Sequence, residues 1–318
     1  MPDVLAAVRA IAGWPELAEP LEEARAACAR LRFHEGLRRR IPEAAAESRV
    51  RGAWADARLE GARVPLETVR DLAVGATRWP EPSEPTWDIV RGSLQVVAEA
   101  ERVAAVLATA PAQALARLHV AAATPLGTAE SGSDAATAPD AATAPDASAT
   151  SDAPVDGGRE VVLGRPRTGA LVVGEFASLP PAPVDVGPRL EALTELLRRS
   201  AGTDAPALVV AAMAHGEVAL VRPFERGNGL VARALERALT IGRGLDATGV
   251  SVPEFGHALV GATAYAGALS AYAQGTREGL VVWVRHCATA ITAGAAEGER
   301  IAEAVRSGRL DRGAGVLA

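Results

Sequence analysis

Apolar residues recur at three- and four-residue intervals through most of this 318-residue chain, which is the spacing of amphipathic α-helices. The pattern predicts helices at residues 3–12, 16–40, 42–51, 65–74, 86–108, 113–123, 186–199, 205–221, 230–241, 253–274, 280–294 and 300–306. The helix at 205–221 is apolar all round apart from His215 and Glu217, so we expect it in the core. Only the apolar run at 170–173 has the character of a strand. The chain is therefore expected to be mainly α.

One segment, residues 124–158, lacks this helical pattern. The hexapeptide Asp-Ala-Ala-Thr-Ala-Pro occurs there twice in tandem, and no large apolar side chain lies between Leu126 and Val155. A segment of this composition cannot bury enough apolar surface to offset the entropy that its chain would lose on ordering. We therefore expect residues 124–158 to be disordered.

A glycine-rich turn between two predicted helices is the main candidate for a binding site. The turn reads Arg226-Gly227-Asn228-Gly229 and leads directly into the helix at 230–241. Glycine tolerates positive φ, and a helix that begins after such a turn directs free backbone N–H groups back toward it. Those N–H groups and the helix dipole favour an anion. Spacing alone leaves two interpretations open, a phosphate site and a purely structural turn.

The residues around this turn resemble the signature of the Fic (Fido) family, His-Pro-Phe-x-Asp/Glu-Gly-Asn-Gly-Arg-x-x-Arg. The matching positions are Pro223, Phe224, Gly227, Asn228, Gly229 and Arg233. Three positions depart from the signature: Arg222 stands at the catalytic His, Arg226 at the metal-binding acid, and Leu230 at the first helix Arg. The resemblance implies a nucleotide-site fold whose usual chemistry is altered or lost.

A second stretch, residues 48–61, resembles the inhibitory helix of many Fic proteins, Ser/Thr-x-x-x-Glu-Gly/Asn. Glu60 and Gly61 match this motif, while Asp56 stands at the Ser/Thr position. The resemblance implies that Glu60 pairs with Arg233, the last Arg of the main signature. The alternative is that Glu60 is an ordinary surface residue at a helix end.

Further resemblances flank the predicted insert, which therefore interrupts one unit. His119 follows a Leu-x-x-Leu pattern typical of the helix before the family's flap, and we expect its side chain to be packed. Residues 164–174, followed by Pro180-Pro181, resemble the flap itself, a β-hairpin. Such a hairpin can add a target peptide as an extra strand, or can be a ribbon without a partner.

The resemblance implies a helical Fic-type domain with a small β-hairpin flap at residues 86–293, interrupted by the insert at 124–158. An N-terminal helical segment that carries the inhibitory-helix-like motif, residues 1–85, precedes this domain. A C-terminal helix and tail, residues 294–318, follow it.

Fic enzymes transfer AMP from ATP to a target hydroxyl, and the departures bear on each step. Arg222 cannot act as the general base, because a guanidinium does not release its proton in proteins. Arg226 places positive charge where Mg²⁺ would bind, so we expect no metal there and no confident catalytic residue. His215, seven residues before Arg222, is either structural or a substitute base.

ATP remains a possible ligand of Gly227, Asn228, Gly229, Arg233 and Arg226. The favoured hypothesis is a degenerate, non-catalytic Fic protein that binds a nucleotide or an unidentified protein target at the flap. The alternatives are an active protein adenylyltransferase with a non-standard base, and a scaffold that binds no nucleotide.

The amino-acid composition limits the expected binding partners and cellular compartment. The net charge of -6 argues against non-specific nucleic-acid binding. Every basic residue is Arg, which we interpret as the codon bias of a GC-rich bacterial genome and not as a functional choice. Cys28 and Cys287 show neither disulfide nor zinc spacing, which suits a reducing compartment. We see no signal peptide and no uncharged run of 18 apolar residues, so we expect a cytoplasmic protein without membrane contact.

Overall fold

The computed structural model describes residues 3–127, 162–171, 176 and 179–310. The helices are α1 (Val4–Ala12), α2 (Pro15–Arg32), α3 (Ile41–Leu59), α4 (Leu66–Ala73), α5 (Pro85–Ala104), α6 (Pro111–Ala123), α7 (Gly187–Ser200), α8 (Ala207–Val221), α9 (Asn228–Gly242), α10 (Pro253–Val260), α11 (Ala262–Ala273) and α12 (Arg277–Ser307). Two short 3₁₀ turns, η1 (Glu35–Leu37) and η2 (Pro125–Gly127), lie between them. The described part of the chain contains no strand, so the mainly α class is confirmed.

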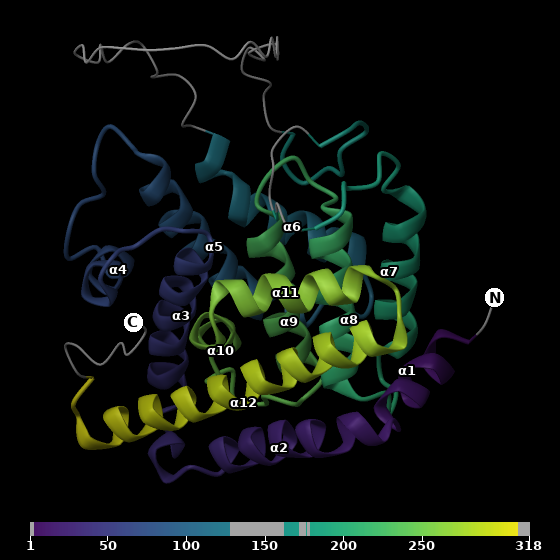
Figure 1. Cartoon of the computed structure of the whole chain (residues 1–318). Coiled ribbons are helices and arrows are strands. Elements are labelled where there is room, and N and C mark those ends of the chain that lie inside the picture. The colour runs from purple at the N-terminus through teal and green to yellow at the C-terminus, as the bar shows by residue number, and fades with distance from the viewer. Residues whose placement is uncertain (1–2, 128–161, 172–175, 177–178, 311–318) are drawn as a thin grey trace, which may run out of the picture.

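Helix α9 lies at the centre of the molecule, between α8 on one side and α5 and α6 on the other (Figure 1). Every residue from Asn228 to Thr240 is buried, including two arginines and a glutamate. Helix α8 beside it is apolar on all faces and is buried as predicted. Only the two ends of α9 are therefore placed to meet a ligand without opening the core.

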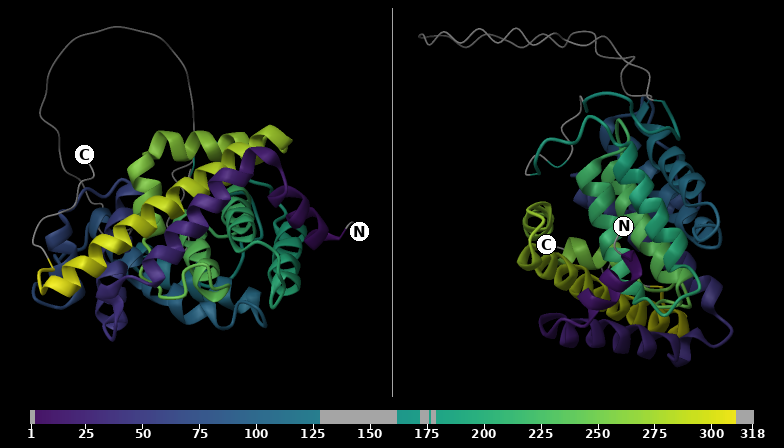
Figure 2. Two further views of the ribbon diagram at one scale, coloured as in Figure 1. Left: turned by 90° about the horizontal axis from the view of Figure 1, so that it is seen from below. Right: turned by 90° about the vertical axis from the view of Figure 1, so that its right-hand side faces the viewer.

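The N-terminal helices pack onto the rest of the fold rather than standing apart from it. Helix α2 runs along the long helix α12 (Figure 2), and α3 packs against α5 and α10. One hydrophobic core extends from Val8 in α1 to Val305 in α12. This packing fixes the end of α3, where Glu60 lies, relative to α9.

Three predicted helices have different bounds in the structure. The helix predicted at 253–274 is divided at Gly261, whose φ of 100° ends α10 before α11 begins. The helices predicted at 280–294 and 300–306 are one helix, α12, so a boundary after residue 293 would fall inside it. Two positions inside α12 are glycines because neighbouring atoms leave no room for a Cβ. A Cβ on Gly294 would lie 2.6 Å from the Val252 backbone, and a Cβ on Gly298 would lie 2.6 Å from the Leu31 side chain.

The helix predicted at 16–40 is also interrupted. It ends at Arg32, and η1 follows before α3 begins at Ile41. Helix α12 is the one described helix long and apolar enough to cross a membrane, but 56% of its most apolar window is buried inside the protein. We describe α12 as a core helix because of this burial, and the cytoplasmic location stays a prediction.

The predicted insert lies mostly outside the described residues. Its first four residues are described and form the end of α6 and the turn η2, so the ordered chain reaches Gly127. The predicted flap is seen in part: residues 162–171 form turns and bends without a strand. Residues 172–175 and 177–178 lie outside the described residues, so a hairpin there and its protein target stay predictions.

Candidate functional site

The turn between α8 and α9 is held by its own asparagine. Arg222 ends α8 in the left-handed conformation, with φ 46°, and Gly227 precedes α9 with φ 77°. The Asn228 Oδ1 accepts a hydrogen bond from the backbone N–H of Phe224, and its Nδ2 donates one to the Phe224 carbonyl, both at 2.9 Å. The Asn228 side chain therefore stabilises the turn. Any contact of Asn228 with a ligand would be made through its backbone N–H.

The turn is anchored to α6 through an aromatic stack. The Phe224 and His119 rings are nearly parallel, with centroids 4.0 Å apart. His119 Nδ1 accepts a hydrogen bond from the backbone N–H of Gly164 at 2.9 Å, and burial lowers the pKa of His119 to about 4. His119 is thus a packed, neutral side chain that joins α6, the turn and the returning chain.

Arg167 is a structural residue whose role the sequence motif does not specify. Its buried guanidinium donates to the carbonyls of Arg222 at 2.8 Å, Val221 at 3.1 Å and Pro183 at 2.6 Å. The backbone N–H of Arg167 donates to the Pro223 carbonyl at 2.8 Å. These bonds satisfy carbonyls that the end of α8 leaves without helical partners.

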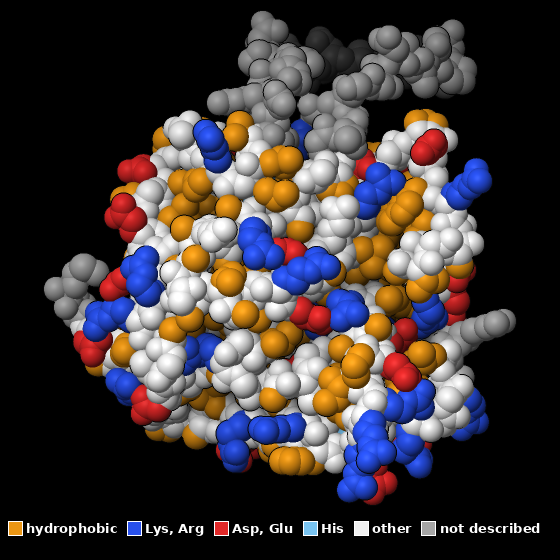
Figure 3. Space-filling view, turned by 180° about the vertical axis from the view of Figure 1, so that it is seen from behind, with side chains coloured by type: hydrophobic (Ala, Val, Ile, Leu, Met, Phe, Trp, Pro, Cys, Tyr) orange, Lys and Arg blue, Asp and Glu red, His pale blue; other side chains and the backbone are white. Residues whose placement is uncertain are grey.

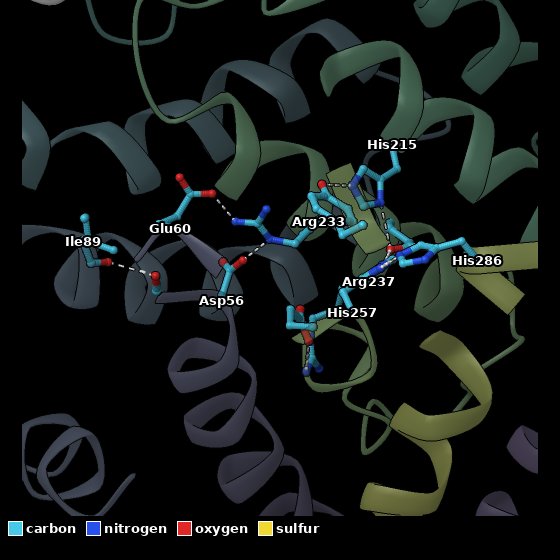
Figure 4. Close-up of polar contacts among 12 residues, drawn as sticks. Asp56, Glu60, Ile89, His215, Arg233, Arg237, His257 and His286 are labelled. Carbon is cyan, nitrogen blue, oxygen red and sulfur yellow. Dashed lines mark hydrogen bonds and ion pairs between the residues drawn. The ribbon is translucent and has the colours of Figure 1, made fainter. Parts of the chain in front are cut away.

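Arg233, in the second turn of α9, holds two carboxylates from the end of α3 (Figure 4). Its Nη2 donates to Glu60 Oε1 at 2.5 Å, which is the pair that the resemblance implies. Its Nε donates to Asp56 Oδ1, a contact that was not expected. Asp56 and Glu60 are four residues apart and so share one face of α3.

The two carboxylates differ in their surroundings. Asp56 is fully buried, and burial raises its pKa to about 7 although the Arg233 charge acts in the opposite direction. The Glu60 side chain is 26% exposed. Asp56 is therefore a fixed part of the core, whereas Glu60 lies at the surface end of the same ion pair.

Glu60 also occupies the space at the start of α9. A Cβ added to Gly229 would lie 2.3 Å from Glu60 Oε1 and 3.2 Å from Arg233 Nη1. The carboxylate thus lies directly against the first turn of α9, where helix N–H groups and the dipole favour an anion. Glycine at position 229 is required for this close approach.

The three residues that depart from the signature have different surroundings in the structure. Arg222 is 4% exposed and donates to the Pro180 carbonyl. Arg226 is half-buried, and its Nη1 lies 3.4 Å from the Leu126 carbonyl of η2. Leu230 is buried in the core near Gly92 of α5. Leu230 therefore contributes packing at a position that holds a phosphate clamp in the signature.

His215 has no opening to a substrate. It is fully buried, its Nδ1 lies 3.0 Å from Glu236 Oε2, and its Nε2 lies 2.7 Å from the Tyr265 hydroxyl. With both ring nitrogens engaged inside the core, His215 is structural, and the alternative of a substitute base loses its support.

Comparison with known proteins was made on sequence and on structure. No protein-family model and no curated protein matches the sequence. Among solved structures, Fic-1 (residues 134–508) from C. elegans superimposes with a TM-score of 0.58 at 18% identity, over 92% of this chain and 73% of that one.

Two bacterial structures are similar to the same extent. A Fic family protein from Desulfovibrio desulfuricans G20 has a TM-score of 0.58 at 17% identity, over 89% of this chain and 74% of its own. A Fic domain containing signaling protein from Bacteroides thetaiotaomicron VPI-5482 has a TM-score of 0.56 at 12% identity, over 92% and 100%. These TM-scores show a shared fold. At identities of 12–18%, the similarity concerns the fold and not the activity. The chain therefore has the Fic (Fido) fold.

Proposed function

We propose that this Fic-fold protein binds the phosphates of a nucleotide, with ATP as the candidate, at the start of α9 and does not transfer AMP. The position of the Glu60 carboxylate carries the proposal. It lies on Arg233 and against Gly229, so an anion already occupies the place that the helix start favours. A phosphate would replace this carboxylate on the same arginine and would lie beside the N–H groups of the helix start.

Binding is supported by what remains when Glu60 moves away. Asp56 holds the Nε side of Arg233, so the guanidinium keeps its orientation in the core. The Nη2 that bonds Glu60 is then available to a phosphate oxygen, and guanidinium–phosphate bonds are among the stronger charge-assisted hydrogen bonds. Gly229, without a side chain, leaves room for that oxygen.

Transfer is disfavoured at the residues that would perform it. Phosphoryl-type transfer depends on positioning and charge stabilisation around a metal-bound nucleotide, with a general base for the attacking hydroxyl. Arg222 stands at the position of the base and cannot accept a proton. Arg226 adds a positive charge at the position of the acid that would hold the metal. We therefore propose binding that does not require Mg²⁺.

Calorimetric titration with ATP, with and without Mg²⁺, tests the proposal. Removing the competing carboxylate in Glu60→Gly should tighten ATP binding about 10- to 100-fold, because a charged hydrogen bond contributes about 1.5–3 kcal/mol. Arg233→Ala should abolish binding. Arg237→Ala is the matched control, since Arg237 is equally buried one turn later and pairs with Glu254 instead.

Glu84→Gly is the second control, an exposed Glu at the start of α5 without a capping hydrogen bond. Equal ATP affinity in the unmodified protein, Glu60→Gly and Arg233→Ala would disprove the phosphate site. Incubation with radioactive ATP provides the other decisive result, because strong labelling of the unmodified protein or of a lysate protein would establish a transferase.

A further inference from the structure

A cluster of histidines and one glutamate lies in the core, on the far side of Arg233 from Asp56 and Glu60 (Figure 4). His215 of α8, Glu236 of α9 and His257 of α10 are all fully buried. His215 Nδ1 lies 3.0 Å and His257 Nε2 lies 2.6 Å from the same oxygen, Glu236 Oε2. Three separate helices thus direct nitrogen and oxygen donors to one point.

The second oxygen of this carboxylate is unusual. Glu236 Oε1 is buried and accepts no hydrogen bond from an N–H or O–H group in the described part of the structure, and its carboxylate neighbours only the weakly donating thiol of Cys287 in α12 on that side. Buried carboxylates are normally paired or bind a metal, because an uncompensated charge in the core is strongly unfavourable. The arginines on either side of Glu236 along α9 bond elsewhere, Arg233 to Asp56 and Glu60 and Arg237 to Glu254. Glu236 therefore has the character of a ligand whose cation comes from solution.

The two imidazoles are oriented through their remaining ring nitrogens. His215 Nε2 lies 2.7 Å from the Tyr265 hydroxyl, and His257 Nδ1 lies 3.0 Å from His286 Nε2. Histidines that bind metals are usually held in this way, with the second nitrogen bonded to a neighbouring polar group. Both rings can present an unprotonated nitrogen to the centre while the outer nitrogen donates a hydrogen bond.

We propose that His215 Nδ1, His257 Nε2 and both oxygens of Glu236 bind one divalent transition-metal ion, with zinc as the first candidate. The donor atoms of the three residues all lie within 4.8 Å of one another. Zinc accepts imidazole and carboxylate ligands at about 2.0–2.2 Å, which places neighbouring donors roughly 3.3 Å apart. The donors at 2.6 and 3.0 Å must then separate by less than about 1 Å, within reach of small side-chain rotations.

The site is structural, because its ligands are buried and come from α8, α9 and α10. Bidentate binding uses Oε1, which has no strong donor beside it, and supplies four donor atoms with the two imidazoles. Successive ligands, His215, Glu236 and His257, are 21 residues apart along the chain, so they form no short metal-binding motif in the sequence. The proposal does not rest on nucleotide binding, and either proposal can fail without the other.

The test uses the full chain, purified without a histidine tag, stripped with a chelator and dialysed against Zn²⁺ or Co²⁺. Elemental analysis should find about one ion per chain, with a raised melting temperature relative to the stripped protein. Bound Co²⁺ should show the strong visible absorption of a four-coordinate site, which octahedral Co²⁺ on a protein surface lacks.

Four variants locate the ion. Glu236→Gln and His257→Ala should lose it, while His119→Gln should retain about one ion per chain, since His119 is a buried histidine outside the cluster. His286→Gln, which removes the imidazole bonded to His257 Nδ1 but no ligand, should weaken binding about 10- to 100-fold. Retention of the metal by both ligand variants would overturn the proposal. So would an unmodified chain that binds no ion or shows only the octahedral Co²⁺ spectrum, a result that needs no variant to fold.

Discussion

Arg233 illustrates how two acidic residues on one arginine can have different roles. Asp56 is buried and bonds Nε, while Glu60 is partly exposed and bonds Nη2. Loss of Asp56 would leave the guanidinium buried without its core partner, an arrangement that typically destabilises a protein by several kcal/mol. Loss of Glu60 leaves Arg233 paired with Asp56. The exposed carboxylate is therefore the replaceable one.

The first residue-scale prediction concerns the missing base. Arg222→His supplies a proton acceptor near neutral pH, but Arg226 still places a cation at the metal position and Glu60 still occupies the start of α9. We expect no protein labelling after incubation of Arg222→His with radioactive ATP and Mg²⁺. Labelling by this single variant would show that Arg226 does not block the metal.

The combination Arg222→His, Arg226→Asp and Glu60→Gly has the best prospect of activity. Leu230→Arg is left out of it, because Leu230 is 1% exposed and an arginine there would place an unpaired charge in the core. Thermal unfolding of each variant separates a loss of fold from a lack of chemistry.

The second residue-scale prediction concerns pH. Burial lowers the pKa of His119 to about 4, from an unfolded value near 6.5, so the folded protein disfavours the protonated form. The stability that neutral His119 contributes is present above pH 6.5 and is lost as the pH falls toward 4. At pH 5 the loss is about 2 kcal/mol relative to pH 7.5.

Urea unfolding at pH 7.5 and at pH 5.0 measures this loss. His119→Gln keeps an acceptor for the Gly164 N–H and does not titrate, so its stability should fall by about 2 kcal/mol less than that of the unmodified protein. An identical loss in both proteins would show that His119 remains protonatable in the fold.

At the scale of helices, the hydrophobic period predicts the elements well and the roles of glycine poorly. Gly261 divides a predicted helix through its positive φ, whereas positions 294 and 298 are glycines inside the continuous helix α12, where other segments approach the backbone. Both roles use the same residue type, and the second depends on contacts with residues far away in the sequence. Local pattern therefore cannot distinguish them.

The prediction at this scale tests the contact between α3 and α9. Gly229→Ala places a Cβ 2.3 Å from Glu60 Oε1, so the pair must be disrupted, with an expected loss of about 1–3 kcal/mol. In a Glu60→Gly background the same change should be neutral or stabilising by up to about 1 kcal/mol, through alanine's higher helix propensity.

Gly267→Ala is the matched control, since Gly267 lies in helix α11 with nothing within 4 Å of an added Cβ. It should be neutral or mildly stabilising in either background. A double-mutant cycle from urea unfolding gives the coupling between positions 60 and 229, and additive effects would contradict the contact.

The candidate site could be predicted only as far as its motifs extend. Glu60 and Arg233, 173 residues apart, are suggested as a pair by two separate sequence motifs. Asp56 has no such indication, because its partner is 177 residues away and its type departs from the motif. The bonds of Arg167 to successive carbonyls likewise depend on the end of α8 and the segment before α7.

The whole molecule has one core, and its surface shows no single dominant charge on the face seen in Figure 3, where arginines, acids and apolar side chains are mixed. The described chain leaves α6 through η2 and returns beside the same helix. Gly164 donates to His119 of α6, and a Cβ at Gly164 would lie 3.2 Å from Val120. The described residues on the two sides of the predicted insert, Gly127 and Gly164, therefore both lie close to α6.

Because the described segments on its two sides meet at the same helix, the insert should be removable. Replacing residues 130–157 with a short Gly-Ser linker shortens a loop without separating its anchors, and loop entropy changes only slowly with length. We expect the melting temperature to change by no more than about 3 °C, since roughly 1 kcal/mol is involved. A fall of about 10 °C or more, measured by circular dichroism, would show that the insert contributes to the fold.

Glu60 lies at the very end of α3, and Gly61 follows it with φ 91°. The carboxylate is thus a tethered competitor, present at a fixed effective concentration that no dilution changes. In the proposed binding protein, the apparent affinity for ATP equals the intrinsic affinity multiplied by the fraction of molecules in which Glu60 has left Arg233. Release of this one side chain, with Asp56 still in place, would then shift the nucleotide concentration at which the protein responds.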